Sequence, residues 1–123
     1  MDSNELKRRT KRFALDVLNF SDQISRSPRN DVIQRQLIRS ATSVAANYRA
    51  ACRARSRADF INKLGIVEEE SDETLFWLEV LDESEICQKA SLVPLEDEAK
   101  QILAIMTSSR KTAKQNNRRS LSR

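Results

Sequence analysis

The sequence contains no histidine, a single glycine, Gly65, and only two prolines among its 123 residues. Without histidine, the chain lacks the commonest general base and metal ligand of proteins. One isolated glycine also excludes the glycine-rich loops that cradle phosphates and dinucleotides. We therefore predict that the protein is not an enzyme and that it holds no cofactor and no metal.

Long apolar segments and paired cysteines are missing as well. No run of about 18 apolar residues is present, so the sequence predicts no membrane span. The first residues lack the apolar core of a signal peptide, which predicts a cytoplasmic location. Cys52 and Cys87 lie 35 residues apart, with no partner motif around them. This spacing is typical of two unpaired thiols in a reducing compartment.

Apolar residues recur at steps of three and four along most of the chain, which predicts amphipathic helices. We expect an all-α protein that forms one domain over residues 1–123, an up-down-up-down antiparallel four-helix bundle. The predicted helices cover residues of about 5–25, 31–53, 57–89 and 95–114, followed by a basic tail at 115–123 that is disordered at its end. The residues expected to cap or begin the last three helices are Asn30, Ser56 and Pro94.

Charge is distributed along the chain in three blocks. Residues 1–57 carry 13 Lys and Arg against 5 Asp and Glu, residues 58–98 carry 2 against 13, and residues 99–123 carry 7 against none. Such blocks either pair with one another or leave a basic surface for nucleic acid. The basic cluster at residues 7–12 could also be a face that keeps the protein soluble. The candidate nucleic-acid contacts are Lys7, Arg8, Arg9, Lys11, Arg12, Arg35, Arg39, Arg49, Arg53, Arg118 and Arg119.

The second predicted helix carries a stripe of small polar residues beside its apolar stripe, so both are expected to face the interior. Counted from the turn near Arg55, Asn47 and Lys63 lie at equal distances. Ser40 and Glu70 also lie at equal distances from this turn. We therefore predict a polar core network between the second and third helices, which either sets their register or forms a binding site. Its expected members are Ser40, Ser43, Asn47, Lys63, Glu70 and Glu73.

The third predicted helix carries apolar residues on two opposite sides. Phe76 and Val80 lie about 160–200° away from the main apolar stripe when the helix is drawn at 100° per residue. One bundle core cannot cover both sides of a helix. We therefore predict that Phe76, Trp77 and Val80 form an interface with another subunit of a ring-like homo-oligomer.

A set of residues between about 31 and 82 forms a recognisable pattern: Arg39, Ser40, Ser43, Ala46, Asn47, Ser56, Asp59, Phe60, Lys63, Leu64, Glu70, Glu73, Trp77 and Leu78. With this pattern the chain resembles the four-helix-bundle family of 23S rRNA intervening-sequence proteins. The resemblance implies a small bacterial bundle that assembles into a ring, commonly a homopentamer. One departure is Ala50, which stands where the family often places a glutamate.

The resemblance also bears on function. The family fold is similar to that of the accessory variability proteins of diversity-generating retroelements, which are basic pentamers that bind nucleic acid and a reverse transcriptase. We expect a non-enzymatic oligomer that contacts the backbone of RNA or DNA through repeated basic surfaces. A protein-binding scaffold without nucleic-acid contacts is the alternative, and a carboxylate metal site is a third, weaker hypothesis.

Overall fold

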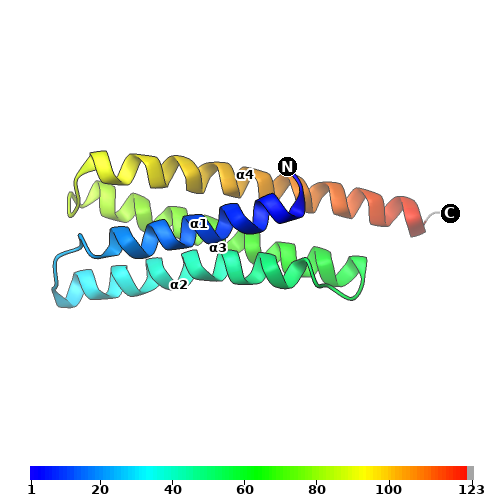
Figure 1. Ribbon diagram of the computed structural model, residues 1–123, viewed down its shortest axis with the longest axis horizontal. Coiled ribbons are helices and arrows are strands. Elements are labelled where there is room, and N and C mark those ends of the chain that lie inside the picture. Colours follow the sequence, from blue (N-terminus) through cyan, green and yellow to red (C-terminus); the bar gives the residue numbers. More distant parts are fainter. Residues whose placement is uncertain (122–123) are drawn as a thin grey trace.

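A computed structural model describes residues 1–121 as four helices, each of which runs antiparallel to the next (Figure 1). They are α1 (Ser3–Ser21), α2 (Pro28–Ala51), α3 (Arg57–Glu83) and α4 (Lys89–Leu121). Each helix packs on the next along the chain, and a smaller contact between α1 and α4 closes the bundle. The predicted all-α bundle with four antiparallel helices is therefore confirmed. No helix in the described part of the chain is both long and apolar enough to cross a membrane.

Side-chain caps fix where the first three helices begin. The Asp2 carboxylate accepts a hydrogen bond from the backbone N–H of Glu5, at 2.8 Å. The Ser56 hydroxyl accepts one from the N–H of Asp59, at 3.1 Å, as predicted. The cap predicted for α2 was wrong, because Ser27 takes that role and Pro28 follows at the first helical position. Asn30 lies inside the helix instead.

The fourth helix begins earlier and ends later than the sequence predicted. It starts at Lys89, so Pro94 lies inside the helix rather than at its first position. Proline removes one backbone hydrogen bond there. Leu92 and Leu95, on either side of Pro94, are both buried, and their packing holds this turn against the core. The helix also includes most of the predicted basic tail, as far as Leu121, and the end of the tail that was predicted to be disordered, residues 122–123, lies outside the described part.

The bundle core is built from aliphatic side chains with few polar groups among them. Leu37, Leu64 and Leu78 are fully buried. The buried hydroxyls of Thr10 and Ser71 donate to carbonyls of their own helices, at 2.9 and 2.7 Å. These short-range bonds satisfy the hydroxyls without a partner from another helix. The core therefore fixes the packing through shape more than through polar contacts between helices.

Gly65 allows one close approach between α3 and α4. A Cβ atom added to Gly65 would lie 3.2 Å from Nε of Arg110. The Arg110 guanidinium lies 3.5 Å from the Glu68 carboxylate on the same side of α3. The lone glycine of the sequence therefore makes room for an arginine side chain, while the α3 backbone at this position remains an ordinary helix.

Candidate nucleic-acid interface

The candidate interface starts with the basic cluster on α1, whose members point in different directions. Arg9 turns inward and donates two hydrogen bonds to Glu98 on α4, at 2.7 and 2.8 Å. These bonds raise the pKa of Arg9 above its usual value. Arg12 lies 3.3 Å from the Asp16 carboxylate of its own helix. Arg9 and Arg12, both predicted as nucleic-acid contacts, are therefore already paired with carboxylates.

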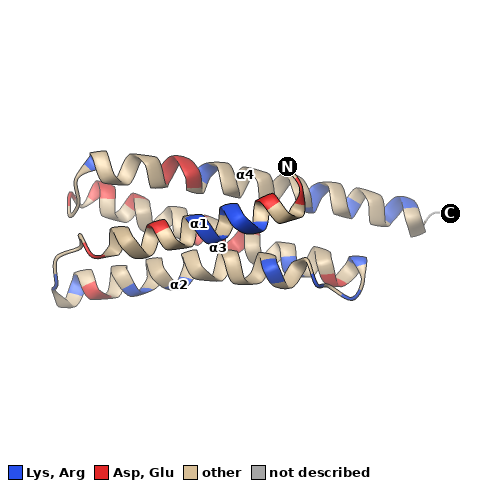
Figure 2. Ribbon diagram, in the orientation of Figure 1, with Lys and Arg blue, Asp and Glu red and all other residues tan. Residues whose placement is uncertain are grey.

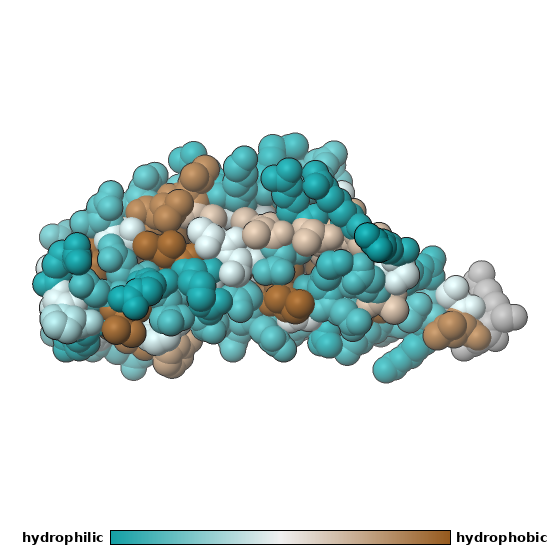
Figure 3. Space-filling model, turned by 90° about the horizontal axis from the view of Figure 1, so that it is seen from below, coloured by the Kyte–Doolittle hydropathy of each residue, from teal (hydrophilic) through white to brown (hydrophobic). Residues whose placement is uncertain are grey.

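The other three cations of α1 border a groove between α1 and α2. Lys7, Arg8 and Lys11 line one side of this groove, which has a volume of about 460 Å³. Its floor is largely apolar and includes Leu15 and Leu18, which are 43% and 38% exposed. Figure 3 views the bundle from the α2 side and shows weakly polar and apolar surface extending along this face between hydrophilic side chains. No motif in the sequence had indicated this groove, because it depends on how α1 and α2 pack.

A second pocket, of about 420 Å³, lies where α2 ends and the chain turns into α3. Ala46 and Arg49 line both the groove and this pocket, so the two hollows are adjacent. Arg53, Arg55 and Lys63 complete the basic lining. Arg55 was absent from the predicted contacts, although the short connection between the helices had to place it beside Arg53. We call the groove and the pocket together the basic end of the bundle.

The cations of the basic end are largely unpaired. Within residues 1–121, no carboxylate lies within 4.0 Å of the charged groups of Lys7, Lys11, Arg49 or Arg53. Lys63 is the exception, because its ammonium lies 2.7 Å from the Asp59 carboxylate. Unpaired cations on a shared surface create a positive potential that attracts anions.

The last turns of α4 extend past the other helices at this same end of the molecule (Figure 1). Arg57 at the start of α3 donates to the backbone carbonyl of Asn116 on α4, at 3.4 Å. The predicted contacts Arg118 and Arg119 belong to this final segment, together with Lys111 and Lys114. Figure 2 shows the resulting asymmetry, with basic residues gathered where α1 begins and where α2 and α4 end.

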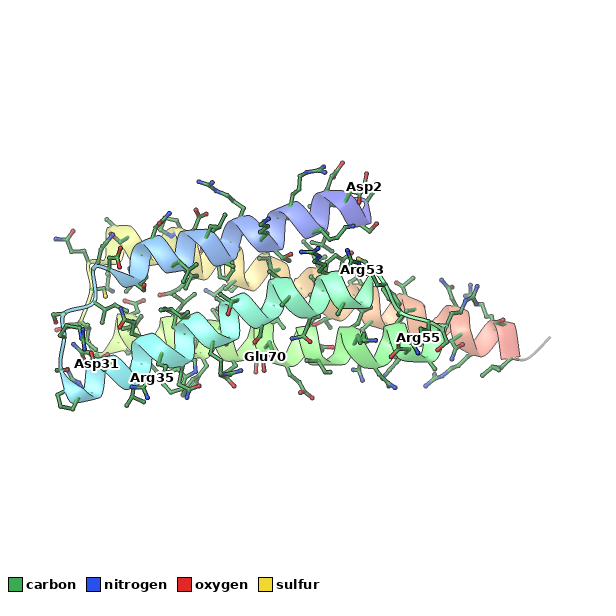
Figure 4. The ribbon with its side chains drawn as sticks, turned by 60° about the horizontal axis from the view of Figure 1, so that its bottom comes forward. Asp2, Asp31, Arg35, Arg53, Arg55 and Glu70 are labelled. Atoms are coloured by element: carbon green, nitrogen blue, oxygen red, sulfur yellow. The ribbon has the colours of Figure 1, made fainter. Side chains whose placement is uncertain are left out.

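Two predicted contacts on α2 lie away from the basic end. Figure 4 places Arg35 near Asp31, at the opposite end of the bundle from Arg53 and Arg55. Arg39 lies between α2 and α3 and forms ion pairs with Glu70, at 3.0 Å, and with Glu73. Arg35 and Arg39 therefore do not belong to the basic end.

The polar network predicted between α2 and α3 does not form as expected. Ser40 is fully buried but donates to the Leu37 carbonyl of its own helix, at 3.2 Å. The Asn47 amide donates to the carbonyl of Ser43, at 2.9 Å. Lys63 pairs with Asp59 on its own helix. The hydroxyl and amide groups thus satisfy themselves within α2, where a backbone carbonyl lies one turn away.

Arg39 makes the connection that the prediction assigned to Ser40 and Asn47. Its guanidinium contacts the carboxylates of both Glu70 and Glu73, and Glu73 also accepts a hydrogen bond from Trp77 Nε1 at 3.3 Å. Sequence reasoning missed this role of Arg39, because spacing along α2 does not show which carboxylates of α3 a long side chain can reach. The cluster lies at the surface, since 45% of the Arg39 side chain is exposed.

The predicted subunit contacts on α3 differ in exposure. The Phe76 ring is 52% exposed and meets the Trp77 ring edge-on, with centroids 4.9 Å apart. Trp77 and Val80 are only partly buried and pack against the bundle core on one side. The bundle therefore leaves Phe76 uncovered and covers the other two in part.

An acidic cluster occupies the far end of the bundle, where α3 ends and α4 begins. One carboxylate oxygen of Glu96, Oε1, is buried and has no hydrogen-bond partner within the described residues. Burial raises the pKa of Glu96, and the neighbouring Asp82 carboxyl raises it further. No group of three or more potential metal ligands occurs in residues 1–121. Cys52 and Cys87 are both free thiols.

Comparison with known proteins identifies the family. A family profile described as 23S rRNA-intervening sequence protein matches residues 2–108. The fold is similar to the crystal structure of a protein with unknown function from the S23 ribosomal protein family of Bacteroides thetaiotaomicron. That similarity has a TM-score of 0.82 and 34% sequence identity, and it covers 90% of this chain and 99% of the other. No curated protein matches the chain. The match over most of its length shows that this chain belongs to the 23S rRNA-intervening sequence protein family.

Proposed function

We propose that this protein is a non-enzymatic, nucleic-acid-binding bundle that contacts phosphate backbones through its basic end. The observation that carries the proposal is the convergence of unpaired cations from separate helices. Lys7 and Lys11 come from α1, Arg49 comes from α2 and Arg53 from the turn that follows α2, yet all four line adjacent hollows. Phosphate contacts of this kind supply the sequence-independent part of nucleic-acid affinity.

The chemistry of this surface favours contacts with phosphates over contacts with bases. No aromatic side chain lines either the groove or the pocket. Proteins that bind single strands through their bases stack those bases on aromatic rings. RNA is the first ligand to test, because the family is described by its link to 23S rRNA.

We also propose that the protein acts as a ring-like homo-oligomer, with a pentamer expected from the family resemblance. The exposed Phe76 ring, beside the partly covered Trp77 and Val80, supports a subunit contact on α3. Burying an aromatic ring against a second copy removes its apolar surface from water. A ring would repeat the basic end in every subunit, so weak phosphate contacts would act together.

The groove between α1 and α2 supports a second candidate function, a scaffold that binds a protein partner. Leu15 and Leu18 expose apolar surface, while Lys7 and Lys11 stand beside them. An amphipathic helix with an acidic flank would match this combination of apolar floor and basic border. In that case the cations would select the partner, and nucleic acid would be absent from the complex.

A salt titration distinguishes the two functions. Labelled hairpin RNA and duplex DNA are titrated with the full-length protein at several salt concentrations, starting at about 50 mM. Backbone binding requires log K to fall linearly with log salt, with a slope that gives the number of phosphates contacted. Failure to bind either nucleic acid at the lowest salt would contradict the proposed function. Binding of an acidic amphipathic peptide without nucleic-acid binding would favour the scaffold.

A further inference from the structure

The pocket between the end of α2 and the start of α3 is lined by four cations and two alanines. The cations are Arg49, Arg53, Arg55 and Lys63, and the alanines are Ala46 and Ala50. We propose that this pocket binds the terminal phosphate of a nucleic-acid strand, as a site distinct from the phosphate diesters along the backbone. This inference rests on the proposed function and deepens it.

The spacing of residues on α2 explains how the pocket is formed. Ala46, Arg49 and Ala50 follow one another at steps of three and one on α2, which places them on one face of the helix, and Arg53 follows in the turn after Ala51. Arg49 on this face and Arg53 in the turn line the pocket with long side chains, while the alanines leave space between them. Any longer side chain at position 50 would extend into the pocket. The pocket volume, about 420 Å³, lies within the range of small-ligand sites.

Asp59 positions the other two cations of the pocket. Its carboxylate lies 2.7 Å from the Lys63 ammonium and accepts a hydrogen bond from the backbone N–H of Arg55, at 3.2 Å. The bond from Lys63, followed by the one from Arg55, lowers the pKa of Asp59, so the carboxylate stays ionised at neutral pH. One carboxylate therefore holds Lys63 and the Arg55 backbone in place while three arginines remain available to a ligand.

A terminal phosphate suits this pocket better than a backbone phosphate does. A phosphate monoester carries about −1.5 to −2 charges at pH 7 and presents three strong acceptor oxygens. A diester within a strand carries one charge, and each Coulomb interaction with a cation is correspondingly weaker. Arginine side chains also bind phosphate oxygens in a bidentate geometry. Several cations around one hollow can therefore engage a chain end more fully than a diester.

The test compares matched single-stranded RNAs in binding titrations with the full-length protein. One strand carries a 5′-phosphate, one carries a 3′-phosphate, and one is unphosphorylated but a nucleotide longer, which supplies a comparable added charge. We expect one of the phosphorylated strands to bind at least about tenfold more tightly than the longer strand, as new charge-assisted hydrogen bonds would require. Equal affinity for all three strands would overturn the terminal-phosphate site and leave the proposed function intact.

Variants of Ala50 provide the second readout. Ala50→Glu places a carboxylate among the cations and should abolish the preference for the phosphorylated strand. Ala50→Gln adds a side chain of similar size without the charge and should retain part of this preference. Ala45→Glu is the matched control, because Ala45 lies on the same helix and lines the adjacent groove but not the pocket. The Ala45→Glu variant should lower the affinity for all three strands equally. Thermal unfolding followed by circular dichroism checks that each variant remains folded.

Three results would contradict the inference in different ways. Retention of the full preference in Ala50→Glu would show that the terminal phosphate binds elsewhere. A nucleoside monophosphate that displaces the phosphorylated strand at equal concentration would assign the pocket to free nucleotides instead of strand ends. Failure of every strand to bind would overturn both this inference and the proposed function.

Discussion

Arg39 of α2 donates a hydrogen bond to the carboxylate of Glu70 on α3, at 3.0 Å, across the interface between the two helices. The same guanidinium contacts Glu73. These bonds are the polar contacts that link the middle of α2 to the middle of α3. Because 45% of the Arg39 side chain is exposed, solvent screens the ion pairs and limits what they add to stability.

Replacing Arg39 should therefore destabilise the bundle only modestly. We expect Arg39→Ala to lower the free energy of unfolding by about 0.5–1 kcal/mol, the upper range for partly exposed ion pairs. Chemical denaturation of Arg39→Ala, Glu70→Ala and the double variant measures the coupling between the two residues. Additive effects of the two single changes would show that the pair contributes no coupling energy.

The basic end predicts which arginines control nucleic-acid binding. Arg53→Gln should reduce affinity for all sequences and lower the slope of log K against log salt by about one unit, because one phosphate is no longer neutralised. Arg35→Gln removes the same charge at the opposite end of the bundle and should leave both values nearly unchanged. Equal reductions in the two variants would mean that net charge, rather than the basic end, determines binding.

The exposed ring on α3 predicts the effect of a charge at the proposed subunit contact. Phe76→Asp should shift the protein from oligomer to monomer in light scattering at micromolar concentration, because a buried, unpaired carboxylate opposes association. Val93→Asp is the control, since Val93 on α4 is 46% exposed, close to the 52% of Phe76. A wild-type protein that is already monomeric under these conditions would refute the oligomer.

Burial of Glu96 predicts a dependence of stability on pH. Its pKa is raised in the folded state, so the protonated form favours folding, and this contribution is lost as the pH rises through the folded-state pKa. Glu96→Gln keeps the neutral form at every pH. The variant should therefore gain stability relative to wild type at pH 7.5 and lose that advantage near pH 4.

Urea unfolding of both proteins at several pH values measures this difference. Asp97→Asn is the control, because Asp97 is exposed beside Glu96 and its removal changes the net charge equally. A constant difference between Glu96→Gln and wild type across the whole pH range would contradict the assigned pKa shift.

Gly65 predicts a stabilising substitution. In a helix interior, alanine is more favourable than glycine by about 1 kcal/mol of folding free energy. The added Cβ would lie 3.2 Å from Arg110 Nε, but this atom belongs to a flexible side chain that can shift by a few tenths of an ångström. We expect Gly65→Ala to raise the free energy of unfolding by about 0.5–1 kcal/mol. A decrease would show that the position of Arg110 beside α3 is rigidly fixed.

Local sequence signals explain why some elements were predictable and others were not. Ser56 was identified as a cap because the hydroxyl and the N–H that it binds are three residues apart in the chain. Pro94 was misplaced because the local rule for proline ignores the burial of Leu92, which holds the preceding turn in the helix. Ser27 and Asn30 are both good caps, and their local sequence did not decide between them.

The sequence by itself determined the helical periodicity, the four segments and their antiparallel order, because these depend on neighbouring residues and short connections. It also revealed the blocks of charge. Only the tertiary structure decided that Lys7, Arg53 and Arg55 share one end while Arg35 lies at the other, and that Arg39 is neutralised by Glu70. Packing and side-chain reach set these relationships, and neither can be derived from spacing along a single helix.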